Sequence, residues 1–227
     1  MLLVTLSAIA VQAAAPVPPP LSPFAKKKAE SLLHDKLPCL GCHELGGDGG
    51  RIGPSLTDVG ARRDRAYIAR MIADPQGTVP GTVMPRVLMP AETRALVVEY
   101  LSGVQGHEPA AASRSLPTAP TPGSRLAAPD LYAKFCSSCH GPSGNGDGPN
   151  ARYLPVPPAR HNDAAWMAAR ADDVLYDAIA GGGAVMGKSP RMPPFGATLS
   201  PAELRALVGY LRTLCACQGP GWSRDGP

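Results

Sequence analysis

Two short stretches decide how this sequence is expected to fold: Cys39-Leu40-Gly41-Cys42-His43 and Cys136-Ser137-Ser138-Cys139-His140. Each is a Cys-x-x-Cys pair followed directly by a histidine. In both halves of the chain a Met-Pro pair follows the motif, at 84–85 in the first half and at 192–193 in the second. An Ala-Glu-x-Arg-Ala-Leu-Val segment comes next, at 91–97 and at 202–208. Such repetition predicts two copies of one module within the 227 residues.

The motif has a specific chemical use. Its two thiols add across the two vinyl groups of a haem, and the following histidine falls under the iron as the proximal ligand. The sequence therefore predicts two covalently bound haem c groups. The expected residues are Cys39, Cys42, Cys136 and Cys139 for the thioether bonds, with His43 and His140 as axial iron ligands.

Three other uses of a cysteine pair compete with this interpretation. A thioredoxin-like redox pair needs a βαβ context, and the sequence shows no alternating strand pattern. A zinc site needs a fourth ligand in each half. A structural disulfide leaves unexplained why a histidine follows both pairs. The repetition of the whole pattern favours haem attachment.

A methionine is the expected sixth ligand in each half. Met84 and Met192 each precede a proline that stiffens the loop, and a thioether raises the haem potential relative to two histidines. Met89 and Met186 compete with them, Met186 from a glycine-rich run and Met89 from the start of the closing helix. We favour Met84 and Met192 because they occupy the same position in the repeat.

A hydrogen bond from the free ring N–H should orient each proximal histidine. The carbonyl of Pro54 is the candidate acceptor in the first half, and that of Pro157 or Pro158 in the second, although an ordinary turn explains these prolines equally well. The remaining histidines could act as distal ligands, but we interpret them as surface residues: His34, His107 and His161.

The composition suits small domains with small cores. Hydrophobic residues make up 44% and aromatic residues 5% of the chain, which also contains 27 prolines and 25 glycines. A covalently bound cofactor would therefore help to stabilise each small domain. The net charge is +4 and the basic residues are scattered, apart from a run at 26–28. With no nucleic-acid motif present, we expect no nucleic-acid binding.

The composition of the two ends and of the middle of the chain predicts where its domains begin and end. Residues 1–15 resemble a secretory signal that lacks the basic start, and an uncleaved anchor is the alternative. Helices are expected over 23–35 and in both closing segments, the second with a capping box from Ser200 to Glu203. The expected division is a signal-like segment and Pro-rich spacer at 1–22, domains at 23–105 and 129–217, a Pro-rich linker at 106–128 and a tail at 218–227.

Both halves resemble class I c-type cytochromes. Leu131-Tyr132-x-x-Phe135 before the second motif and Met192-Pro193-Pro194-Phe195 before the last helix look like the common bacterial module. The first half, with Gly53-Pro54-x-Leu56, is similar to cytochrome c domains of oxidase and dehydrogenase complexes, but Glu44 stands where the second motif has glycine. The resemblance covers about residues 25–103 and 127–217. It implies an all-α fold of two tandem domains, each with its helices packed around a haem. The tandem arrangement loosely resembles the dihaem cytochrome c4 group.

The expected function is single-electron transfer without catalysis, in an exported, periplasmic respiratory or photosynthetic chain. The resemblance implies redox partners such as a quinol-cytochrome c reductase, a terminal oxidase, a dehydrogenase or a reaction centre. The alternatives are a haem enzyme of the dihaem peroxidase or thiosulfate-oxidising type, and a cytochrome subunit fixed in a membrane oxidoreductase complex by its N-terminus or by Cys215 and Cys217. These two cysteines are expected to be too close for an unstrained disulfide, so a bridge to a partner chain or a metal is also considered.

Overall fold

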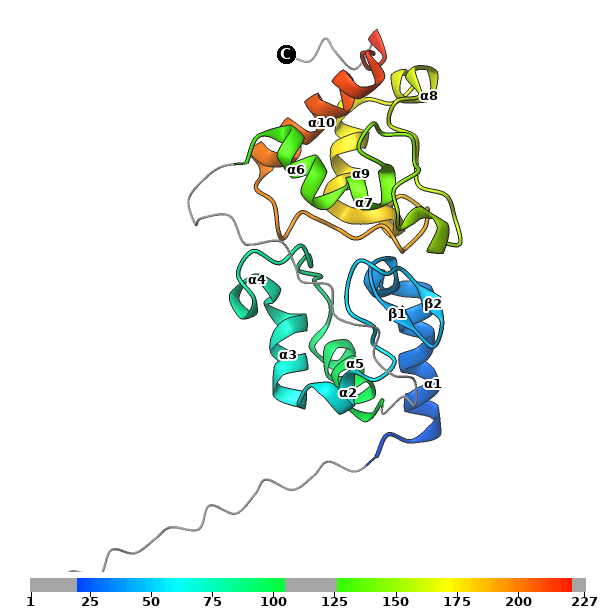
Figure 1. The fold of residues 1–227 in the computed structure, drawn as a ribbon, viewed down its shortest axis with the longest axis vertical. Helices are drawn as coiled ribbons and strands as arrows, with labels where there is room; N and C mark the ends of the chain where they lie inside the picture. Colours follow the sequence, from blue (N-terminus) through cyan, green and yellow to red (C-terminus); the bar gives the residue numbers. More distant parts are fainter. Residues whose placement is uncertain (1–19, 105–125, 222–227) are drawn as a thin grey trace, which may run out of the picture.

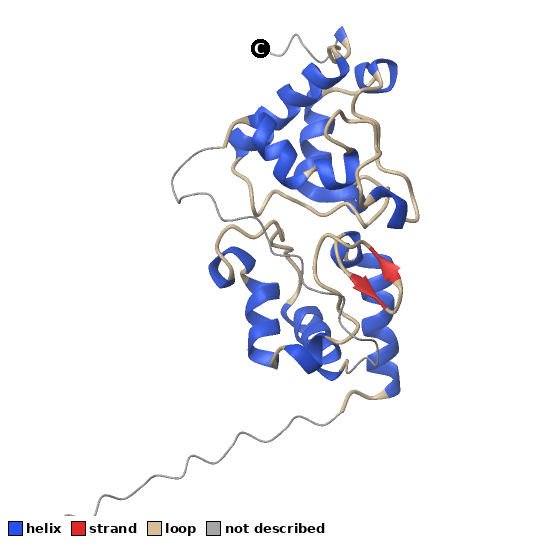
Figure 2. Ribbon diagram, in the orientation of Figure 1, coloured by secondary structure: helices blue, strands red, loops and turns tan. Residues whose placement is uncertain are grey.

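The computed structural model describes residues 20–104 and 126–221, and helices make up most of the regular structure there (Figure 2). They form two bodies stacked end to end, one from each half of the chain (Figure 1). The predicted helical fold is confirmed, and it is consistent with a cytochrome c fold. The sequence did not predict the short antiparallel pair β1 (Glu44–Leu45) and β2 (Asp48–Gly49), because strands of two residues are too short to show alternation.

Local capping signals start the first helix. The side chain of Ser22 accepts a hydrogen bond from the Ala25 N–H, and Pro23 occupies the first helical position, where its missing N–H costs nothing. The expected helix over 23–35 is present, although its last turn widens into a π-helix. The helical elements of the first half are α1 (Pro23–Ser31), η1 (Leu32–Lys36), η2 (Pro38–Gly41), α2 (Val59–Arg62), α3 (Arg65–Ala73), α4 (Pro75–Thr78) and α5 (Ala91–Gly103).

The second half starts its closing helix with the predicted capping box. Ser200 accepts from the Glu203 N–H, and the Glu203 carboxylate accepts from the Ser200 N–H at 2.8 Å. In the first half the residue at the cap of α5 is Pro90 rather than Met89, and it makes no side-chain cap. The helical elements here are α6 (Ala128–Phe135), α7 (Ser137–His140), η3 (Ala151–Tyr153), α8 (Ala164–Ala168), α9 (Asp172–Val185) and α10 (Pro201–Cys215).

Each half has its own hydrophobic core. In the first half α5 packs against α3 and α1, and in the second half α10 packs against α6 and α9. The first core is smaller and lacks a buried aromatic side chain, whereas Tyr132 and Phe195 lie in the second. The main buried residues are Leu33, Leu40, Leu45, Leu56, Ile68, Val97, Val98 and Leu101 in the first half, and Leu131, Tyr132, Met167, Leu204, Leu207, Val208 and Leu211 in the second.

Two buried polar side chains of the second half join it to the first. Arg191 donates to the Leu40 carbonyl at 3.0 Å and forms an ion pair with Asp48 at 2.7 Å. Asn150 donates to the Gly41 carbonyl at 2.8 Å and accepts from the Arg51 N–H at 2.7 Å. Because buried polar groups need such partners, these bonds fix how the halves sit. Most of the expected linker, at 106–125, lies outside the described residues, as do residues 1–19 of the signal-like segment and spacer.

A glycine kinks α9 where the chain of the second half folds back on it. Gly182 has a φ of 78°, and a Cβ there would lie 2.8 Å from the Met192 carbonyl oxygen. The Gly183 N–H donates to the same carbonyl at 3.0 Å. The glycine-rich run at 181–183 therefore lets the loop that carries Met192 lie directly against the helix.

Gly182→Ala should destabilise the second half more than an alanine at another left-handed glycine. Gly187 is the matched control, because its φ is 64° but a Cβ there meets nothing within 4 Å. We expect Gly187→Ala to cost about 1–2 kcal/mol from the left-handed backbone alone. Gly182→Ala should cost about 1–3 kcal/mol more from the steric contact. Denaturant unfolding followed by circular dichroism measures both, and equal losses would contradict the close packing.

The ion pair of Asp48 should make the stability of the joined halves depend on pH. The hydrogen bond from Arg191 lowers the pKa of Asp48, and a second one from His34 adds to the effect. The stabilisation is therefore present above the unfolded-state pKa and is lost as the pH falls through the folded-state pKa. Asp48→Asn should lower the unfolding free energy near pH 7 by about 1 kcal/mol, a modest value because Asp48 is partly exposed.

The difference between wild type and Asp48→Asn should shrink steadily in titrations from about pH 7 to about pH 2. Asp177→Asn, at an exposed position on α9, serves as the control and should follow the wild type. A difference that does not change with pH would show that Asp48 contributes no charge interaction.

Candidate haem-attachment sites

The first motif forms a tight turn whose histidine is held by a distant carbonyl. The N–H groups of Cys42 and His43 both donate to the Cys39 carbonyl, at 3.2 and 3.0 Å. The Nδ1 of His43 lies 2.7 Å from the Pro54 carbonyl oxygen, the acceptor that the sequence suggested. When Nδ1 carries the proton and donates, Nε2 keeps its lone pair free for a metal.

The loop of Pro54 approaches the histidine ring so closely that only glycine fits beside it. A Cβ on Gly53 would lie 2.4 Å from Cε1 and 2.6 Å from Nδ1 of His43. The backbone of residues 53–54 therefore supports one side of the ring and accepts its proton at the same time.

Glu44, the residue that departs from the family pattern, ties this loop to the motif. Its carboxylate accepts hydrogen bonds from the Ser55 hydroxyl, the Thr57 hydroxyl and the Gly47 N–H. Burial raises the pKa of Glu44, but these bonds outweigh it and hold the carboxyl below its usual range. Since Ser55 follows Pro54 directly, Glu44 positions the carbonyl that orients His43.

In the second half the orienting carbonyl belongs to the residue that follows the two predicted ones in the chain. The Nδ1 of His140 lies 2.9 Å from the carbonyl oxygen of Ala159, so the assignment to Pro157 or Pro158 is wrong. Contact with the glycine-rich turn sets this register, because the Asn162 N–H donates to the Gly144 carbonyl at 3.2 Å. Such a contact between distant segments leaves no signal in the local sequence.

A cavity of about 800 Å³ opens beside the second motif. Cys136, Cys139, His140 and Met192 all line it, so the structure brings together the four residues predicted for this half. Met186 lines it as well and remains the competing sulfur ligand. The size and the mostly apolar walls suit a large flat cofactor.

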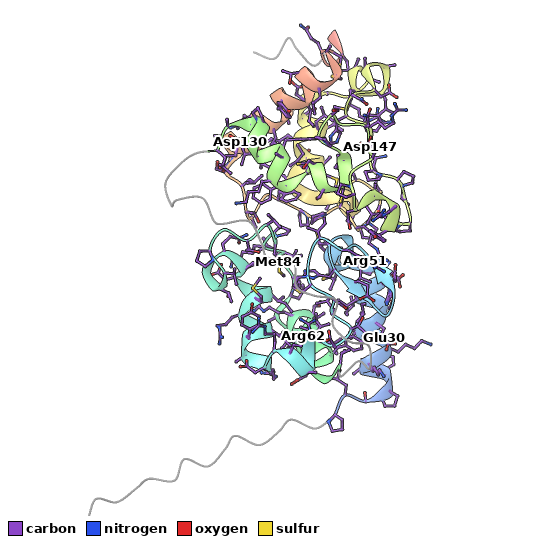
Figure 3. The ribbon with its side chains drawn as sticks, viewed as in Figure 1. Glu30, Arg51, Arg62, Met84, Asp130 and Asp147 are labelled. Carbon is purple, nitrogen blue, oxygen red and sulfur yellow. A yellow bond between two sulfur atoms is a disulfide. The ribbon has the colours of Figure 1, made fainter. Side chains whose placement is uncertain are left out.

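In the first half the structure brings Cys39, Cys42 and His43 together, while Met84 lies on the loop between α4 and α5. Its backbone is fixed by Gln76, whose side-chain amide donates to the Met84 carbonyl at 2.7 Å. Figure 3 shows Met84 in the part of the first half that faces the second. Within the described residues no hydrogen bond joins Met84 to residues 39–43, so its role as a ligand stays a prediction.

Burial leaves the motif side chains uncharged. It lowers the pKa of His43 and of His140, against the opposing hydrogen bonds to Pro54 and Ala159, and a neutral imidazole is the metal-binding form. Burial also raises the pKa of Cys39 to about 11 and those of Cys42 and Cys136 to about 12. A thioredoxin-like pair needs a lowered thiol pKa, so these values disfavour that alternative.

Two of the remaining histidines contact other side chains of the protein. His161 lines the cavity, with its ring stacked on that of His140 at a centroid distance of 4.1 Å, so the prediction that it is a surface residue is wrong. His34 is partly exposed and lies 2.9 Å from Asp48. His107 falls outside the described residues. Over 20–104 and 126–221, no three residues among His, Cys, Asp and Glu gather as a metal ion would require.

Cys215 and Cys217 form a disulfide with each other at the end of α10. Ala216 between them adopts a left-handed conformation with a φ of 47°, which reverses the chain as helix ends often do. Cys215 is buried in the second core, and the guanidinium of Arg212 approaches the sulfur of Cys217 at 3.7 Å. The pair is therefore closed within the chain, whereas the four motif cysteines form no disulfide.

Peptide mass mapping of the unreduced protein should confirm this pairing. The peptide that contains both Cys215 and Cys217 should resist alkylation and weigh two hydrogens less than its reduced form. After reduction both thiols should take the alkylating agent. Alkylation of either cysteine without reduction would contradict the disulfide.

One family model agrees with the geometry of the second half. Residues 127–215 match the family model for cytochrome c. No curated protein matches the chain. Among solved structures, a chain of the reducing HAO-like protein complex of Kuenenia stuttgartiensis is similar at 24% identity over 88% of this chain and 99% of that chain, with a TM-score of 0.33. The family match supports a c-type cytochrome whose second half is a cytochrome c domain, with the covalent haem c and the electron-transfer role that this domain implies.

Proposed function

We propose that the chain is a dihaem c-type cytochrome that transfers single electrons between redox proteins. The observation that carries the proposal is the repetition of one geometry in both halves. Each Cys-x-x-Cys pair is followed by a histidine whose Nδ1 meets a backbone carbonyl, at 2.7 Å in the first half and 2.9 Å in the second. Two separate hydrophobic cores support two haem modules, proposed at 23–105 and 129–217 with a linker between them.

The residues present fit haem c. The Gly53 backbone and the Pro54 carbonyl hold His43 in one tautomer, and the apolar cavity beside His140 has room for the macrocycle. When bound, the haem supplies an iron that cycles between Fe(III) and Fe(II). The residues that would hold it are Cys39, Cys42, His43 and Met84 in the first half, and Cys136, Cys139, His140 and Met192 in the second.

The surrounding side chains would then set how readily each site accepts an electron. A histidine that donates from Nδ1 to a carbonyl is a better donor at Nε2, and a methionine sulfur favours the reduced state. The walls of the second site are mostly apolar, so they would favour the less charged, reduced state. With a methionine available in each half, neither site needs an open position for substrate, which favours a carrier over a haem enzyme.

The cellular setting is part of the proposal. The signal-like segment supports export to the periplasm, where a quinol-cytochrome c reductase, a terminal oxidase, a dehydrogenase or a reaction centre would be the partners. Across the described ranges 20–104 and 126–221, no helix is long and apolar enough to cross a bilayer. Recovery in a membrane fraction that resists salt washing would favour a subunit of a membrane complex instead.

The first test is the haem content and spectrum of protein matured with a haem-attachment system. We expect two haems per chain under denaturing conditions, and a ferric spectrum with the weak red band of methionine sulfur on iron. Met192→Ala should remove about half of that band if both sites carry methionine, because the band reports the bond between the methionine sulfur and the iron. The same change should lower one of the two potentials, since a thioether favours Fe(II). Met186→Ala, at a residue lining the same cavity, is the matched control and should leave the band intact.

The opposite outcomes are equally clear. One haem per chain would overturn the dihaem proposal, and loss of the band in Met186→Ala would move the ligand to Met186. A haem that lacks methionine and binds added cyanide would contradict the carrier and direct attention to catalysis at that iron.

A further inference from the structure

His161 covers one face of the imidazole that is predicted to bind the second iron. Its ring lies nearly parallel to that of His140, with the centroids 4.1 Å apart and an angle of 16° between the two planes. Burial lowers the pKa of His161, and the neighbouring His140 adds to the effect. Burial also lowers the pKa of His140, so both rings are neutral and stack without charge repulsion.

Tyr132 holds the ring of His161 in place. The Tyr132 hydroxyl donates to the Gly141 carbonyl at 3.1 Å, and its oxygen lies 3.1 Å from Nδ1 of His161. Because a carbonyl can only accept, the Tyr132 oxygen accepts the second hydrogen bond from the His161 Nδ1–H. Tyr132 is 1% exposed in the second core, and Gly141 directly follows His140. One fixed hydroxyl therefore binds both the backbone next to His140 and the ring stacked on it.

A single short segment contacts His140 at its edge and on its face. The Ala159 carbonyl accepts from Nδ1 of His140, and His161 lies two residues further along the chain. The glycine-rich turn packs behind this segment, because a Cβ on Gly144 would lie 3.0 Å from the Cβ of His161. The His161 ring is thus held from three sides, by His140, by Tyr132 and by the turn.

The first half holds its histidine in a different way. The Gly53 backbone lies against the edge of the His43 ring, and within residues 20–104 and 126–221 no aromatic ring stacks on His43. The residue two positions after the acceptor Pro54 is Leu56, which is buried in the first core. The equivalent position therefore carries leucine in the first half and histidine in the second.

We propose that His161, oriented by Tyr132, is a positioning residue that fixes the plane of the His140 imidazole and thereby sets the second site apart from the first. The inference rests on the proposed function, in which His140 is an iron ligand. A hydrogen bond at Nδ1 alone leaves the ring able to tilt about that bond, whereas a ring stacked on its face removes this freedom.

The stacked ring should also affect how readily the second site accepts an electron. The ferric state places more positive charge on the ligand imidazole than the ferrous state does, and the electron-rich face of a neutral aromatic ring stabilises such charge. His161 should therefore favour the oxidised form of the second site. The first site, with Leu56 at the equivalent position, has no such contribution.

The test compares the ferric haem methyl proton shifts of the matured protein with those of His161→Leu, which copies the first half. These shifts depend on the orientation of the axial imidazole plane. The resonances of the second haem, identified by Overhauser contacts to Phe195 in its cavity, should move while those of the first stay in place. At a fixed applied potential, the ratio of reduced to oxidised second haem should rise by about threefold.

Three further variants separate positioning from a general loss of structure. His161→Phe keeps a ring on the face of His140 and should restore most of the wild-type shifts. Tyr132→Phe removes only the hydroxyl and should move the same resonances by a smaller amount. Asn162→Ala is the matched control next to His161, because it loses only a side-chain bond to Asn145, and it should match the wild type.

Unchanged methyl shifts of the second haem in His161→Leu would overturn the inference, and so would equal shifts in His161→Leu and His161→Phe. Where His161→Leu does not fold, unchanged shifts in Tyr132→Phe would overturn it in the same way. These outcomes leave two haems in each chain. A haem content of one per chain would instead overturn the proposed function itself.

Discussion

In each half, the ring of the motif histidine is held by one hydrogen bond from Nδ1 to a backbone carbonyl, of Pro54 or of Ala159. This bond selects the tautomer and the direction of the ring, so the free Nε2 always points the same way. Much of the surrounding loop structure serves it. In the first half Glu44 anchors the loop that carries the carbonyl, and Gly53 allows that loop to reach the ring. In the second half a glycine-rich turn sets the register of the acceptor.

Each half has its own small hydrophobic core, so the two halves could separate if only a linker joined them. The structure instead inserts two polar side chains, Asn150 and Arg191, into the first attachment loop. Burying an arginine is costly unless its charge and its donors are satisfied, and here Asp48 and the Leu40 carbonyl do both. Such a contact tolerates little displacement, so it gives the two sites a defined relative position that hydrophobic contact alone would leave looser.

The same residues lie close to both predicted attachment sites. Arg191 lies beside the predicted ligand Met192, and Gly41 lies beside Cys42, a cysteine predicted to bind haem, so a shift in the contact reaches both predicted sites. The kink at Gly182 adds to this coupling, because it brings α9 against the backbone of Met192. Loop, ligand and interface form one connected structure in which the second half supports the first.

The sequence by itself determined the parts that depend on neighbours in the chain. The spacing of both Cys-x-x-Cys-His motifs, the capping box at Ser200 and the helix that begins at Pro23 follow from local chemistry, and the structure contains each of them. Pro54 was suggested as an acceptor as well, although an ordinary turn explained it equally. Only the tertiary structure decided that Ala159 is the second acceptor, that His161 stacks on His140 and that Asn150 bridges the halves. These contacts join residues far apart in sequence, and their geometry depends on how whole helices pack, which no local pattern encodes.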